Sequence, residues 1–175
     1  MKKSCIHIYC GDGKGKSTAA MGLTVRAAGS GKKVILTQFM KNGSSSEFKV
    51  LETLPQVHIF SCKKSFGFIW NMTPEQKEAA RTAYTELFDQ VTRAAVEEKA
   101  FLLVMDEFMS AYNLGMIDKE KALKFLQEKP EGLEVVLTGR DPAPELLELA
   151  DYVSEICKRK HPFDQGIPAR KGIEM

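Results

Sequence analysis

The sequence lacks the long apolar runs of signal peptides and membrane-spanning helices. A transmembrane helix needs roughly 20 consecutive apolar residues, and after its two lysines the N-terminal "MKKSCIHIYC" has no long apolar stretch. The 175 residues are 43% apolar and 27% charged, a composition typical of soluble globular proteins. We expect a single domain over residues 1–175 and a cytoplasmic protein.

An excess of one charge and closely spaced cysteines are also missing. The formal charge is +2, and no stripe of lysine and arginine interleaved with aromatics indicates a nucleic-acid partner. The one dense basic run, "KRKH" at 158–161, is typical of a solvated surface. The cysteines form no CxxC pair, and a secreted disulfide framework would be denser, so we expect reduced thiols at Cys5, Cys10, Cys62 and Cys157.

Apolar runs bounded by turn residues alternate with longer segments of helical period. This alternation is typical of βαβ units and predicts an α/β fold, with a mostly parallel central sheet of about six strands flanked by helices. The predicted strands are residues 5–10, 33–40, 57–62, 100–106, 133–139 and 151–157.

Capping signals predict where several helices begin. "TPEQ" places Thr73 as the cap of the longest helix, Pro74 at its first position and Gln76 in a capping box, and this helix should end near residue 98. Asp118 should cap the helix in "IDKEKALKFLQEKP". A short helix in "DPAPELLELA" should start at Asp141 or at its prolines. The stretches 41–47 and 62–72 are less regular.

The stretch "CGDGKGKST", residues 10–18, lies between the first strand and a helical segment. It has the spacing of a Walker A phosphate-binding loop except that Cys10 occupies the position of the first glycine. Its glycines let consecutive N–H groups converge on an anion at a helix N-terminus. Lys16 adds a positive charge, Ser17 a hydroxyl for Mg²⁺, and the Asp12 carboxylate must point away from phosphate or toward a cation. We expect nucleotide phosphates to be bound by Gly11, Asp12, Gly13, Lys14, Gly15, Lys16, Ser17 and Thr18.

Two later strands should deliver further charged groups to the same edge of the sheet. "FLLVMDEF" ends an apolar strand in Asp106 and Glu107, the Walker B arrangement, in which one carboxylate holds Mg²⁺ directly or through water. Arg140 in "LTGRDP" follows another strand. It should contact phosphate, the alternative being an ion pair with Asp141 or Glu145.

Several segments resemble those of the P-loop-type ATP:corrinoid adenosyltransferases, which make adenosylcobalamin. They are "YCGDGKGKSTAAMGLTVRAAGSGKKVILTQFMK", "GFIW", "MDEF", "LTGRDPAPELLELADYVSEI" and "KHPFDQGIPARKGIE". The resemblance implies a P-loop NTPase-like fold. The loops of this family are preceded by a residue other than glycine, so Cys10 lies at a position where the family already departs from Walker A.

The resemblance also implies the reaction. A Co(I) corrinoid attacks the 5′ carbon of ATP, and the whole triphosphate leaves, its charge neutralised by Lys14, Lys16, Arg140 and Mg²⁺. Lys16 would act on the triphosphate, and Phe68 and Trp70 would pack beside the corrin, where their alternative role is a hydrophobic plug. The C-terminal tail would fold back over the site. A homodimer and a flavoprotein electron donor are further expectations.

Two other functions fit the same residues. A small kinase or NTPase would share the loop and Asp106-Glu107 but release ADP, and a nucleotide-dependent binding module would show no turnover. The sequence leaves open whether the corrinoid acceptor is cobalamin or a biosynthetic precursor.

Overall fold

The computed structural model describes residues 4–41, 45–64, 66–67 and 71–174. Its centre is one sheet of six parallel strands in the order β3-β2-β4-β5-β1-β6. Every residue of β2 and β4 is buried, as expected of strands covered on both faces. The strands are β1 (Ile6–Cys10), β2 (Val34–Gln38), β3 (Val57–Ser61), β4 (Leu102–Asp106), β5 (Glu134–Thr138) and β6 (Tyr152–Glu155).

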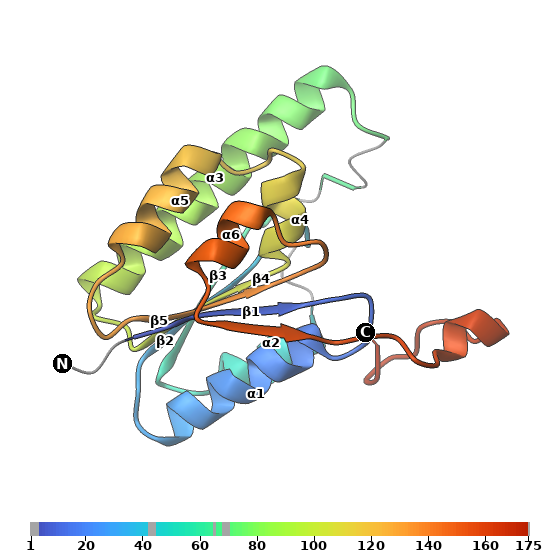
Figure 1. Ribbon diagram of the computed structural model, residues 1–175, viewed down its shortest axis with the longest axis horizontal. Helices are drawn as coiled ribbons and strands as arrows, with labels where there is room; N and C mark the ends of the chain where they lie inside the picture. The colour runs from blue at the N-terminus through green and yellow to red at the C-terminus, as the bar shows by residue number, and fades with distance from the viewer. Residues whose placement is uncertain (1–3, 42–44, 65, 68–70, 175) are drawn as a thin grey trace.

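Helices cover both faces of this sheet (Figure 1). Two of them, α1 (Lys16–Gly29) and α2 (Ser46–Leu51), lie on one face, and the other four lie on the opposite face. These four are α3 (Pro74–Glu97), α4 (Phe108–Asn113), α5 (Lys119–Glu128) and α6 (Pro144–Leu149). The C-terminal tail carries a short 3₁₀ helix, η2 (Pro162–Gln165), and extends beyond the ends of β1 and β6. Across the described residues, no helix is long and apolar enough to cross a membrane.

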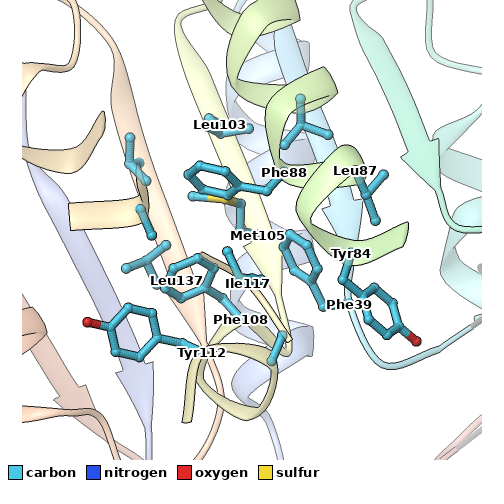
Figure 2. Close-up of a cluster of buried hydrophobic side chains, with 14 of the residues drawn as sticks. Phe39, Tyr84, Leu87, Phe88, Leu103, Met105, Phe108, Tyr112, Ile117 and Leu137 are labelled. Carbon is cyan, nitrogen blue, oxygen red and sulfur yellow. The ribbon is translucent and has the colours of Figure 1, made fainter. Parts of the chain in front are cut away.

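The larger of the two apolar cores lies between the sheet and the four helices α3 to α6 (Figure 2). Phe39, Phe88 and Phe108 meet there with ring centroids 6.0 Å apart for Phe39–Phe108 and 6.4 Å for Phe88–Phe108. Burying each such side chain contributes about 1.5–3 kcal/mol. This core holds the sheet rigid beneath the strand ends, where the loops of interest lie.

All six predicted strands are confirmed. Thr73 and Gln76 form a reciprocal capping box at the start of α3, and the Asp118 side chain accepts the N–H of Lys121 to cap α5.

Three details differ from the prediction. The helix after β5 begins at Pro144, so the proline alternative is confirmed and the alternative start at Asp141 is wrong, since Asp141 has a left-handed φ of 51° and makes no side-chain cap. The irregular stretch 41–47 leads into α2 at Ser46, and α4 follows directly on Glu107. Both helices have six residues, too short for a clear helical period.

Candidate nucleotide-binding site

The phosphate loop lies against the segment that follows β6. Gly11 and Gly15 have φ values of 101° and 126°, a region that residues with side chains rarely adopt. A Cβ atom at Gly11 would lie 2.5 Å from the carbonyl oxygen of Ile156, and one at Gly13 would lie 2.6 Å from it. The Gly13 N–H donates to this carbonyl at 2.7 Å. The glycines therefore permit close packing of two backbone segments as well as the turn itself.

Cys10 occupies the first Walker A position as a strand residue. Its carbonyl accepts the N–H of Ile156 at 2.8 Å, and its φ is not in the left-handed region, so glycine is not required there. The side chain is 5% exposed and lies in the larger core. Burial, followed by the charge of Glu155, raises the pKa of the Cys10 thiol. Cys10 is therefore a packing residue beneath the loop.

Asp12 and Lys16 have specific partners. Asp12 Oδ1 accepts the N–H of Lys158 at 2.8 Å, and this hydrogen bond holds the pKa of the carboxyl below its usual value. The carboxylate is thus directed at a backbone donor. Lys16 Nζ donates to the carbonyl of Gly13 at 2.8 Å. Burial, followed by the nearby charge of Arg140, lowers the pKa of Lys16, as expected for a cation held partly out of water.

The two acidic residues after β4 differ in environment. Asp106 is fully buried and accepts hydrogen bonds from Thr138 Oγ1 and Gln38 Nε2, both at 2.6 Å. Glu107 has a left-handed φ of 57°, its N–H donates to Thr138 Oγ1 at 3.0 Å, and its carboxylate accepts from Ser110 Oγ at 3.1 Å. Glu107 lines the pocket described next, whereas Asp106 does not.

A pocket of about 910 Å³ lies at the carboxyl edge of the sheet and brings most of the predicted residues together. The phosphate loop from Asp12 to Thr18 forms one wall, Glu107 and Arg140 another, and the start of α2 a third. The tail supplies the remaining wall through His161, Pro162, Phe163, Ile167, Pro168, Ala169, Gly172, Ile173 and Glu174. Gly11 does not line the pocket.

Arg140 lines the same pocket as the phosphate loop. Within the described part of the chain, its guanidinium forms an ion pair with neither Asp141 nor Glu145, and the Glu145 carboxylate instead accepts the hydroxyl of Tyr112 at 2.8 Å. The Arg140 charge also helps to lower the pKa values of Asp12 and Lys16. Three charged groups of the site therefore lie within electrostatic reach of one another.

The oxygen donors at this edge are suited to Mg²⁺. Ser17, which has a hydroxyl, and Glu107, which has a carboxylate, line the pocket, and Asp106 is hydrogen-bonded to Gln38, which also lines it. Among the described residues, no group of three or more His, Cys, Asp or Glu side chains could hold a metal ion. Mg²⁺ is commonly bound through one or two carboxylates together with substrate phosphates. The site therefore fits this cation when a triphosphate supplies the remaining ligands.

Phe68 and Trp70 lie outside the described residues. The residues around them contact the larger core: the Phe66 ring lies 5.8 Å from that of Tyr84 on α3, and Met72 is 8% exposed. The proposed corrin-facing roles of Phe68 and Trp70 therefore remain predictions.

Sequence reasoning missed several residues that shape the pocket. Gln38, Lys41 and Ser45 line it, and the signal that could have found Gln38 is a polar residue at the end of the buried run "KVILTQ". His161 Nδ1 accepts the N–H of Phe163 at the start of η2 and also faces the pocket. His7 and His58 bond to Glu134 and Glu98 away from it.

The phosphate loop between the first strand and first helix of a parallel sheet, with an acidic pair after a buried strand, defines a P-loop protein of the NTPase-like class. The fold is similar to that of the KaiC-like protein PH0186 of Pyrococcus horikoshii, with a TM-score of 0.57 at 14% identity over 92% of this chain and 76% of that one. Residues 2–175 match the family model "ATP:corrinoid adenosyltransferase BtuR/CobO/CobP", and the chain belongs to this family.

Two relatives are similar along almost the whole chain. The corrinoid adenosyltransferase of Escherichia coli (strain K12) is 33% identical over 186 aligned residues, covering 99% of this chain and 86% of the relative. That of Pseudomonas aeruginosa is 31% identical over 175 residues, covering 99% and 85%.

Proposed function

We propose that this protein transfers the 5′-deoxyadenosyl group of ATP to the cobalt of a reduced Co(I) corrinoid and releases triphosphate, in adenosylcobalamin biosynthesis or salvage. The family match supports the reaction. The observation that carries the proposal is a single pocket that combines the phosphate loop with four cationic side chains, Lys14, Lys16, Lys41 and Arg140. Such a site suits a triphosphate as leaving group.

The bond changes define what these residues must do. The carbon–oxygen bond at the 5′ carbon breaks with its electron pair moving to the triphosphate, and the cobalt–carbon bond forms. Negative charge therefore grows at the α-phosphate. Lys14 and Lys16 would stabilise this charge from the phosphate loop, and Arg140 would do so from the opposite wall of the pocket. Preorganised cations of this kind are most effective where water is excluded.

Mg²⁺, when bound, supplies further charge neutralisation on the triphosphate. Ser17 and Glu107 would hold it, with Asp106 as a direct or water-mediated partner. The loop residues Asp12 to Thr18 line the pocket and would supply backbone N–H groups, except for the Gly13 N–H, which donates to the Ile156 carbonyl, and Gly11 would shape the turn.

Nothing in this reaction requires a general base to activate water. Among the described pocket residues, the histidine is His161, whose Nδ1 accepts a backbone N–H. This arrangement suits a reaction in which positioning and electrostatics are the contribution of the protein. Phe68 and Trp70 would act on the corrin substrate, easing reduction of its cobalt before transfer.

Further parts of the proposal concern assembly and supply. The chain would act as one domain over residues 1–175 in the cytoplasm, and a flavoprotein would supply the electron that gives Co(I). We also propose a homodimer: Tyr152 and Val153 on the edge strand β6 are 55% and 50% exposed, and an edge strand presents unpaired backbone groups to a second chain. Light scattering at several protein concentrations tests this state.

The decisive experiment is product analysis after incubation with ATP, Mg²⁺ and chemically reduced corrinoid. Phosphorus NMR should show intact triphosphate, and the optical spectrum should show the adenosylated corrinoid. ADP as the main phosphorus product would support the kinase or NTPase alternative. Binding of ATP with no product would support the binding module. Lys16→Ala, assayed in parallel, controls for contaminating activity.

A further inference from the structure

Gln38 links Asp106, a candidate Mg²⁺ ligand, to Ser45 at the start of α2. It is the last residue of β2, directly opposite Asp106 in the β2–β4 register, and it is 1% exposed. Its Nε2 donates to Asp106 Oδ2 at 2.6 Å, and its Oε1 accepts from Ser45 Oγ at 2.8 Å. An ionised carboxylate only accepts hydrogen bonds and the serine hydroxyl donates here, so both bonds require this orientation of the amide.

These bonds belong to a longer chain of polar groups across three strands. Asp106 Oδ1 accepts from Thr138 Oγ1 on β5, and the same hydroxyl accepts the N–H of Glu107. Each Asp106 oxygen thus has one protein donor and keeps acceptor capacity for another partner. A buried carboxylate is costly unless it is hydrogen-bonded. The two donors, Thr138 and Gln38, therefore stabilise the buried Asp106 carboxylate and fix its orientation.

The residue type at position 38 is well matched to both neighbours. A primary amide donates from one end and accepts at the other, which a glutamate in its ionised form does not. A glutamate would place like charges beside each other, and a lysine would compete with the cation for Asp106. Ser45 and Gln38 also line the pocket, whereas Asp106 does not. Asp106 is therefore linked to the pocket through its hydrogen bond with Gln38.

We propose that Gln38 is a positioning residue, which orients the Asp106 carboxylate toward the cation bound with the nucleotide and couples it to Ser45 at the start of α2. This inference rests on the proposed function only in that the pocket binds ATP with Mg²⁺. Its consequence is that the Mg²⁺-dependent part of ATP affinity depends on Gln38, and to a smaller extent on Ser45.

The test compares Gln38→Met with Thr37→Val. Thr37 is the preceding residue of β2, is fully buried, and its hydroxyl has no hydrogen-bond partner among the described residues. Its side chain points to the opposite face, because successive side chains alternate along a strand. Calorimetric titration with ATP, in excess Mg²⁺ and in EDTA, separates the metal-dependent part of the ATP affinity from the metal-independent part. Spectra of Mn²⁺, added in place of Mg²⁺, report binding of the cation directly.

In Gln38→Met, the gain in ATP affinity produced by Mg²⁺ should fall by roughly 10–100-fold, the usual effect of removing a group that orients a metal ligand. The affinity in EDTA should change far less, and Thr37→Val should match the wild type in both conditions. An unchanged Mg²⁺ effect in Gln38→Met would overturn the proposal, as would an equal loss in Thr37→Val.

Ser45→Ala keeps the proposal testable if Gln38→Met does not fold, because Ser45 is partly exposed. It should lose part of the Mg²⁺-dependent affinity, and wild-type behaviour would disprove the coupling to α2. None of these titrations contains corrinoid. ADP in the product assay would therefore reject the proposed function while leaving the Gln38 result to be judged by itself.

Discussion

Replacing Gly13 with alanine should destabilise the protein strongly, although alanine usually stabilises a chain relative to glycine. The φ of Gly13 is outside the left-handed region, so the cost is steric. The new methyl group would meet the Ile156 carbonyl oxygen at 2.6 Å and the Cys157 carbonyl carbon at 2.9 Å. These are backbone atoms, which cannot rotate away, so the segment after β6 must move off the loop.

The expected magnitude has two parts. Overpacking of this kind costs about 1–3 kcal/mol, and the Gly13–Ile156 hydrogen bond, which is 2.7 Å long, contributes about 0.5–1.5 kcal/mol net. We therefore expect Gly13→Ala to lower the free energy of unfolding by about 2–4 kcal/mol. With a urea dependence of about 2 kcal/mol per molar, the midpoint should fall by roughly 1–2 M.

Gly22→Ala is the matched control. Gly22 is exposed inside α1, and an added Cβ would have no atom within 4 Å. This substitution should raise stability by about 0.5–1 kcal/mol. Urea unfolding of both variants checks the pair, and ATP titration should show weaker binding for Gly13→Ala alone. If Gly13→Ala unfolds within about 0.5 kcal/mol of the wild type, the close packing of the loop on Ile156 is wrong.

Four further predictions concern individual groups of the site. Lys16→Ala should lower transfer activity by roughly 10²–10³-fold, because it removes the cation beside the leaving group; wild-type turnover would remove Lys16 from the mechanism. Phe68→Ala and Trp70→Ala should slow assays started from Co(II) corrinoid far more than assays started from Co(I), with ATP affinity retained; equal rates with early melting would indicate a hydrophobic plug. The hydrogen bond from the Lys158 N–H lowers the pKa of Asp12 in the folded state, so its stabilising effect is present above the unfolded value of about 4 and disappears as the pH falls through the folded value. Urea midpoints of Asp12→Asn and wild type should therefore converge at acid pH, and a constant difference would contradict this. Cys10 is buried with a raised pKa whereas Cys157 is exposed, so iodoacetamide should label Cys157 long before Cys10 by mass spectrometry; similar rates would show that the loop opens.

The sequence by itself determined the elements and the chemical type of the loop. The six strands follow from apolar runs, which are local, and the α3 cap follows from Thr73 and Gln76, which are three residues apart. The phosphate loop is equally local, because its glycines and Lys16 act within one strand-to-helix turn. The resemblance added a reaction that these residues do not specify alone.

Only the tertiary structure decided which distant residues share the site. The strand order places β5 between β1 and β4, which brings Thr138 beside Asp106 and Arg140 toward the loop. Asp12 meets the Lys158 N–H across 146 residues, and Gln38 meets Asp106 across 68. The periodicity of a helix or strand indicates only which face of the element a residue occupies. It does not predict which residue lies beside it on the neighbouring strand. The partners of Asp12 and Asp106 therefore arise from how the elements pack, since strand order and register depend on contacts between segments far apart in the chain.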